Sequence, residues 1–198
     1  MFKSKHYVPI LKWKRAEQGA LKALEEKHKK LITPVIQFVM PKQKAGDQMS
    51  NLVARFEEQL LKIPENIVDV WGKAPIFIDF SLLFTAPLKV KSIGGILRGG
   101  LKLGAGFIPV VHLNDEHEIK KAAYSFAKEN GGGVCLRLVC PDFSDLEKLN
   151  QNIKEFVLST SLAEKDIDIL VDIKEIETSG DKFIKYLNLS QRINNLTK

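Results

Sequence analysis

Cysteine is scarce in this sequence, with two among 198 residues. Cys135 and Cys140 lie on either side of one apolar run, so a disulfide-stapled mini-fold is excluded and we interpret both as reduced thiols of a cytoplasmic protein. No window reaches the roughly 18 consecutive apolar residues that a membrane-spanning helix needs. The N-terminal residues carry basic side chains but no long apolar run and no small-residue cleavage site, so we expect no signal peptide.

The excess of positive over negative charge is also small. Lys and Arg number 30 against 24 Asp and Glu, which gives a formal net charge of +6. This balance is compatible with an anionic ligand without requiring one. Basic residues are scattered, and Trp13 between Lys12 and Lys14 is the one aromatic and basic spot that could stack a base, so nucleic-acid binding is disfavoured. With 44% hydrophobic residues, the chain can bury a core without metal or disulfide staples.

Familiar catalytic and cofactor motifs are missing. The four histidines show no spacing typical of a zinc site, and there is no Gly-x-Ser-x-Gly elbow, so we expect no metal and no cofactor. Glycines are frequent between positions 94 and 106, but Leu101 stands where a phosphate-binding loop has Lys. The segment Ala86–Gly106 is therefore either a loose helix or a glycine-rich loop, and as a loop it would expose Ile96 and Leu97 to partners.

What is present is a regular alternation. Six short runs rich in Val, Ile and Phe predict strands, several of them apolar nearly throughout, as expected for parallel strands covered on both faces. These strands are Tyr7–Leu11, Ile32–Met40, Pro75–Phe80, Phe107–Leu113, Val134–Val139 and Ile167–Ile173.

Amphipathic segments with apolar residues three and four positions apart separate these runs and predict helices. The helices are Ala16–Leu31, Met49–Ile63, Glu65–Trp71, Asp115–Lys128, Asp145–Thr160 and Ser179–Leu196.

The order is therefore βα repeated about six times, which predicts an α/β fold with a parallel sheet. Two architectures fit: an incomplete TIM-barrel-like repeat, two strands short of eight, and an open doubly wound sheet. We find no fixed-period repeat and no low-complexity linker, so we expect one domain over residues 1–198.

Three segments carry a resemblance to a known family. The run from Tyr7 to Leu21, the run Ile32–Gln37 and the run Pro75–Phe80 with Asp79 resemble the phage and prophage beta protein family. Members of that family are longer and barrel-like, so the resemblance favours the barrel and implies a truncated member or an excised part. It also implies phage–host conflict as the context, and it carries no established activity to transfer.

Polar residues interrupt or close each apolar run. In parallel α/β folds ligands meet the carboxyl ends of strands, so we expect these side chains to converge on one rim. The set is predicted to comprise Asp79, His112 and Asp172 as catalytic residues, with Lys12, Lys14, Gln37 and Arg137 as ligand-binding residues.

The rim has several possible chemistries. Lys12 and Arg137 could neutralise Asp79 and Asp172, or could hold a phosphate or carboxylate, with Arg137 supplying a bidentate fork. His112 could move a proton near neutral pH. Equally, strand-end polar residues often only satisfy loop backbone.

Two functions follow from these observations. One is an interaction protein in phage–host conflict, in defence or counter-defence, because an incomplete barrel leaves sheet edges that a protein partner or a second copy must cover. The alternative is an enzyme or sensor that binds an acidic or phosphorylated small molecule at the rim.

Overall fold

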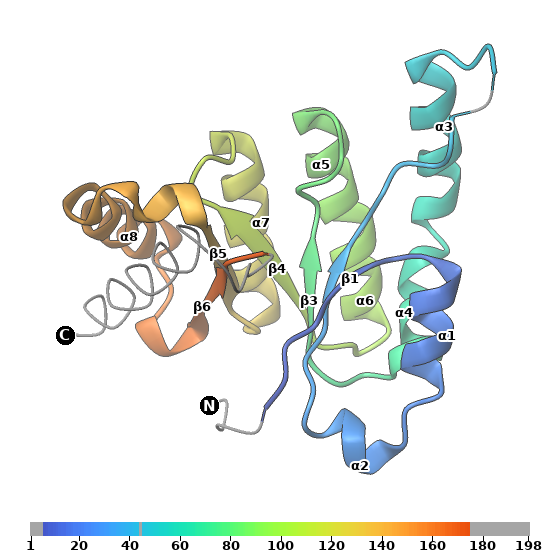
Figure 1. Cartoon of the computed structure of the whole chain (residues 1–198), viewed down its shortest axis with the longest axis horizontal. Helices are drawn as coiled ribbons and strands as arrows, with labels where there is room; N and C mark the ends of the chain where they lie inside the picture. The colour runs from blue at the N-terminus through green and yellow to red at the C-terminus, as the bar shows by residue number, and fades with distance from the viewer. Residues whose placement is uncertain (1–5, 44, 175–198) are drawn as a thin grey trace, which may run out of the picture. The chain divides into compact units, whose positions relative to one another are not determined.

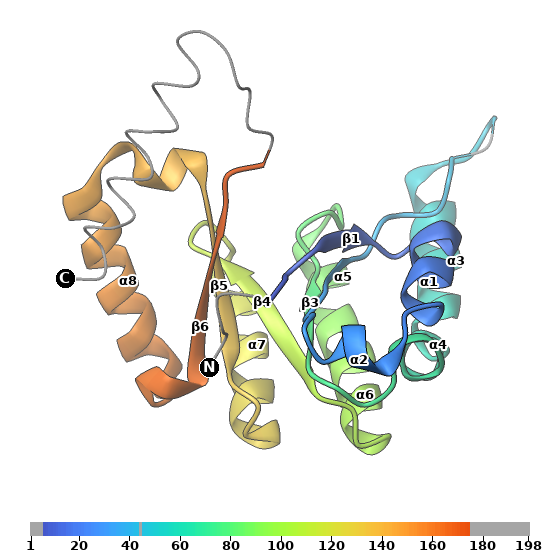
Figure 2. The ribbon, with the colours of Figure 1, turned by 60° about the horizontal axis from the view of Figure 1, so that its bottom comes forward.

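The computed structural model describes residues 6–43 and 45–174, and the helix predicted at Ser179–Leu196 lies outside them (Figures 1 and 2). Six strands form one sheet in the order β1-β2-β3-β4-β5-β6. Their bounds are β1 Ile10–Lys12, β2 Val35–Gln37, β3 Ile76–Asp79, β4 Phe107–His112, β5 Val134–Val139 and β6 Ile167–Asp172.

Helices fill the connections between successive strands. The α-helices are α1 Arg15–Lys22, α2 Glu26–Lys29, α3 Met49–Leu60, α4 Ile63–Trp71, α5 Ala86–Ser92, α6 Arg98–Lys102, α7 His117–Asn130 and α8 Leu146–Thr160. A π-helix, η1, spans Ile93–Leu97, and two 3₁₀-helices are η2 Cys140–Ser144 and η3 Glu164–Asp166. The predicted α/β fold with a parallel βα repeat is confirmed.

The strand order decides between the two predicted architectures. β1 pairs with β2, β2 with β3 and β3 with β4, each in parallel. A doubly wound sheet reverses its strand order at a switch point, whereas a barrel repeat adds each strand beside the previous one. The sequential order is therefore that of the barrel-like repeat.

The chain divides into two compact units. Of the described residues, the first unit comprises those up to Val111 together with Asp115–Val134, and the second comprises His112–Asn114 and residues 135–174. The single domain expected from the sequence stays a prediction.

In the first unit, polar residues at the ends of neighbouring strands lie on one face of the sheet, and the aromatic residues that follow them lie on the other. Gln37 and Asp79 occupy paired positions of β2 and β3, and the rings of Phe38 and Phe80 in the next positions stack at 5.6 Å between centroids. Helices α1 and α4 lie side by side in both ribbon views. Successive side chains of a strand point to opposite faces, so both faces of this part of the sheet are occupied.

The helix predicted at Ala16–Leu31 is in fact two helices, α1 and α2. The backbone of Glu25 between them is extended, with φ −67° and ψ 148°, and this interrupts the helix. After the break, the ammonium of Lys29 lies 5.9 Å from the centre of the Trp71 ring. The residues after the break thus make a contact with α4 that the local helical pattern does not indicate.

The glycine-rich segment is helical, so the loop alternative for Ala86–Gly106 is wrong. Ile96 and Leu97 are fully buried within η1. A Cβ atom added at Gly100 would come within 2.2 Å of the Phe107 ring, and one at Gly99 within 2.5 Å of Pro64. Glycine at positions 99 and 100 therefore lets α6 approach its neighbours closely.

No helix in the described part of the chain has the length and apolar character that crossing a bilayer requires.

Candidate functional site

The carboxyl ends of β1, β2 and β3 place three of the predicted site residues in one row. Lys12 pairs with Gln37 in the register of β1 and β2, and Gln37 pairs with Asp79 in that of β2 and β3. Paired residues of neighbouring strands lie on the same side of a sheet. Lys12 is exposed, Gln37 is 8% exposed and Asp79 is completely buried, so the row runs from solvent into the protein.

A hydrogen-bond network fixes the buried end of this row. Gln37 Nε2 donates to Asp79 Oδ2 at 3.1 Å and to Ser81 Oγ at 3.2 Å. The backbone N–H of Ser81 donates to Asp79 Oδ1 at 2.7 Å, which closes a turn immediately after β3. Because a carboxylate only accepts, the Gln37 amide must present its nitrogen to Asp79, and its carbonyl oxygen Oε1 is directed elsewhere as an acceptor.

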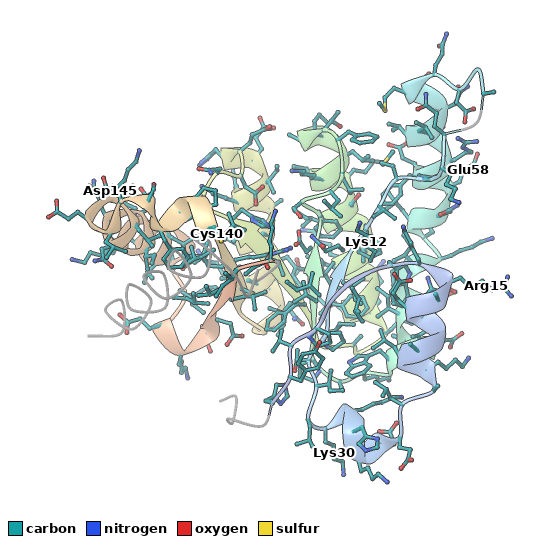
Figure 3. The ribbon with its side chains drawn as sticks, in the orientation of Figure 1. Lys12, Arg15, Lys30, Glu58, Cys140 and Asp145 are labelled. Atoms are coloured by element: carbon teal, nitrogen blue, oxygen red, sulfur yellow. The ribbon has the colours of Figure 1, made fainter. Side chains whose placement is uncertain are left out.

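Further cations follow β1 at the start of α1. Lys14 is the residue at the N-terminal cap of α1, and it is exposed with no side-chain capping bond. Figure 3 shows Lys12 among the strands and Arg15 on the outer side of α1, pointing away from it. Lys12 is therefore the cation that belongs to the strand-end row.

In the second unit, Arg137 and Asp172 form a buried ion pair. Arg137 Nη2 donates to Asp172 Oδ2 at 2.5 Å, and the two side chains are 7% and 8% exposed. Lys174 N–H donates to Asp172 Oδ1 at 2.9 Å, and the Lys174 backbone is left-handed with φ 60°. Neutralisation of Asp172 by Arg137 is one of the alternatives expected from the sequence, and this pair is present in the structure.

His112 and Cys140 also lie at strand ends in this unit. His112 is the last residue of β4 and is partly buried. The Cys140 thiol follows β5 and contacts the Ile173 carbonyl oxygen at 3.5 Å. Cys135 and Cys140 are not joined in a disulfide.

The structure thus brings together Lys12, Gln37 and Asp79 in one unit and Arg137 with Asp172 in the other. The catalytic roles assigned to Asp79, His112 and Asp172 stay predictions. Ser81 was missed by the sequence analysis, although a serine two residues after a strand-end aspartate is a recognisable turn signal.

A groove with a volume of about 370 Å³ lies among the helices of the first unit, and Lys12, Gln37 and Asp79 are not among its lining residues. Val90, Ile93 and Phe126 contribute apolar walls, and Arg98 and Lys121 contribute charge. Arg98 Nε is 3.3 Å from Glu129 Oε2, in an exposed ion pair. The groove offers a hydrophobic recess between α5, η1 and α7, which the sequence pattern did not indicate.

Burial raises the pKa of the Asp168 carboxyl on β6 above its usual value, because desolvation disfavours the charged form. Within the described ranges, no three His, Cys, Asp or Glu side chains are grouped so that they could hold a metal ion. The described strand ends carry cations, an amide, carboxylates, the His112 imidazole and the Cys140 thiol.

The comparison with known families bears on the whole chain. No curated protein matches it. The model of a family described as beta protein matches residues 7–197, which includes every strand and helix described above. The chain therefore belongs to the beta protein family.

Proposed function

We propose that this protein binds an acidic or phosphorylated small molecule at the carboxyl ends of β1–β3. The observation that carries the proposal is the single row formed by Lys12, Gln37 and Asp79 across three parallel strands. Loops at the carboxyl ends of the strands form the ligand sites of barrel-type α/β proteins.

The three side chains offer complementary chemistry. The exposed Lys12 ammonium supplies positive charge for a phosphate or carboxylate. Gln37 Oε1 supplies an acceptor for a hydroxyl or amine of the same ligand, since Nε2 is held by Asp79 and Ser81. Asp79 has both carboxylate oxygens engaged in these bonds, so it acts as a positioning residue for Gln37. The best-fitting ligand class is a small hydroxylated anion such as a sugar phosphate.

Thermal unfolding in the presence of ribose 5-phosphate tests this proposal. A ligand at tenfold its dissociation constant stabilises the folded state by RT ln 11, about 1.4 kcal/mol. For a chain of this length such a gain raises Tm by about 3–6 °C. We expect this rise with ribose 5-phosphate and none with ribose at equal concentration and ionic strength.

Two variants locate the effect. Lys12→Gln removes the exposed cation while keeping the Gln37–Asp79 bond, and it should abolish the ligand-dependent rise in Tm. Lys102→Gln, an exposed lysine on α6, is the matched control and should keep it. A full rise in Lys12→Gln, or no rise in the unaltered protein, would refute the proposal.

A second candidate function is an interaction protein in phage–host conflict, as the family resemblance implies. The loop after β3 favours it, because Leu82 and Phe84 are 39% and 57% exposed there. Exposed apolar side chains close together on a loop suit a protein contact. A second copy of this chain is the first partner to test, because it needs no other molecule.

Light scattering measures that association directly. We expect a dimer that becomes a monomer in the Phe84→Ser variant, with the same circular dichroism as the unaltered protein. A protein that is monomeric at high concentration contradicts self-association through this loop and leaves ligand binding as the better account.

A further inference from the structure

The strands of the two halves of the chain end in the same order of side chains. A long basic or imidazole side chain closes the first strand, an amide or guanidinium donor lies on the second, and an aspartate closes the third. The matched pairs are Lys12 with His112, Gln37 with Arg137, and Asp79 with Asp172.

The match extends along each strand. Residues 7–13 read Tyr-Val-Pro-Ile-Leu-Lys-Trp, and residues 107–113 read Phe-Ile-Pro-Val-Val-His-Leu. Residues 35–41 read Val-Ile-Gln-Phe-Val-Met-Pro, and residues 135–141 read Cys-Leu-Arg-Leu-Val-Cys-Pro. In the third strand, residues 76–80 read Ile-Phe-Ile-Asp-Phe, and residues 169–173 read Ile-Leu-Val-Asp-Ile.

Matched residues of the first and second strands of each half are 100 positions apart in the sequence, whereas Asp79 and Asp172 in the third strands are 93 positions apart. No single period runs through the chain because the connection before the third strand differs in length. The similarity between the two halves is therefore visible strand by strand and has no fixed sequence period.

The hydrogen bonds repeat as well, down to the carboxylate atom. Oδ2 of Asp79 accepts from the side chain of Gln37 on the preceding strand, and Oδ2 of Asp172 accepts from Arg137 on the preceding strand. Oδ1 of each aspartate accepts the backbone N–H two residues later, at 2.7 Å and 2.9 Å. Buried apolar strands resemble one another for packing reasons alone, but packing does not require this polar arrangement.

We infer that the chain consists of two copies of a three-stranded βα unit, β1–β3 and β4–β6, and that each copy carries its own binding site for an anionic small molecule. The second site comprises His112, Arg137 and Asp172. This inference rests on the function proposed above for the first site, and it adds an equivalent site in the second copy.

The second site has chemistry suited to an anion. The Arg137 guanidinium is a planar cation whose N–H groups match the geometry of phosphate and carboxylate oxygens, and its Nη2 donates to Asp172. Asp172 holds that guanidinium as Asp79 holds the Gln37 amide. His112 supplies at β4 the ring nitrogens that correspond to the Lys12 ammonium at β1.

A titration of the ¹⁵N-labelled full chain with inorganic phosphate, at constant ionic strength, tests the inference by NMR. We expect two groups of amide resonances to shift: one from residues near Lys12 and Gln37, and another from residues near His112 and Arg137. Lys12→Gln should abolish the first group of shifts and leave the second.

Arg137→Gln is the matched variant for the second site. Glutamine keeps a hydrogen-bond donor, as at position 37, but removes the charge, so the variant should be less stable than the unaltered protein, and phosphate binding at the second group should weaken about tenfold or more. The spectrum of the free variant reports whether it is folded.

The outcomes separate the two proposals. Shifts only in the first group, abolished by Lys12→Gln, support the proposed function and overturn the second site. Absence of shifts in both groups overturns both proposals. Shifts in the second group that persist unchanged in Arg137→Gln also overturn the second site.

Discussion

The buried pair of Arg137 and Asp172 allows a quantitative prediction. Both side chains are less than a tenth exposed, and their charged atoms are 2.5 Å apart. Replacing Arg137 with Met keeps most of the side-chain volume but leaves the Asp172 carboxylate buried without its guanidinium. Removing one partner of a buried ion pair costs about 3–5 kcal/mol of the free energy of unfolding.

An exposed pair at a similar distance provides the control. Lys27 Nζ lies 2.7 Å from Glu25 Oε2, but these side chains are 69% and 64% exposed. Because water already solvates both charges, Lys27→Met should change the free energy of unfolding by less than about 1 kcal/mol. The two pairs have similar distances and very different burial.

Urea denaturation at neutral pH, followed by circular dichroism, measures both losses. The double variant Arg137→Met, Asp172→Asn removes both charges, while the asparagine oxygen still accepts from Lys174 N–H. It should recover most of the stability lost in Arg137→Met, with a coupling free energy of about 2–3 kcal/mol. A loss below about 1 kcal/mol in Arg137→Met, as expected for a solvated pair, would refute the argument.

Other consequences are testable in the same way. Gly100→Ala should destabilise the protein by about 1–3 kcal/mol, because the added Cβ would lie 2.2 Å from the Phe107 ring. Gly19→Ala in α1 should instead stabilise the protein by about 0.5–1 kcal/mol, because the added Cβ meets no atom within 4 Å. Equal effects of the two variants in urea titrations would contradict the packing argument. Asp168→Asn should raise Tm at pH 7, because the raised pKa of Asp168 means that its ionisation destabilises the folded state. This destabilisation is absent below the pKa of Asp168 in the unfolded chain, and it is fully present once the pH has risen above the pKa in the folded protein. The gain should therefore shrink toward pH 3, and a gain independent of pH would show that desolvation is not its cause. Asp145→Ala removes the side-chain acceptor of Lys148 N–H at the start of α8 and should cost about 1 kcal/mol, measured by the same unfolding assay, while an unchanged midpoint would exclude a capping role.

Local pattern was sufficient for most elements. The strand predicted at Val134–Val139 has those bounds in the structure, and Phe107–Leu113 and Ile167–Ile173 differ by a residue at one end. Runs of Val, Ile and Phe bounded by turn residues specify buried strands without reference to distant contacts. The alternation of strands and helices likewise predicted the parallel sheet.

The glycine-rich segment shows where local pattern fails. Glycine disfavours a helix by propensity, yet residues 86–102 are helical. The reason lies elsewhere in the chain, because Gly99 and Gly100 pack against Pro64 and Phe107. Contacts between residues distant in sequence offset the low helix propensity of glycine, and the local sequence pattern does not predict these contacts.

The sequence by itself determined which residue types stand at the strand ends, since each polar residue there interrupts an apolar run. Tertiary structure alone decided their partners, because hydrogen bonding depends on strand register. Register sets Gln37 opposite Asp79, and the fold places Arg137 against Asp172. A shift of one residue along a strand would turn these side chains to the other face of the sheet.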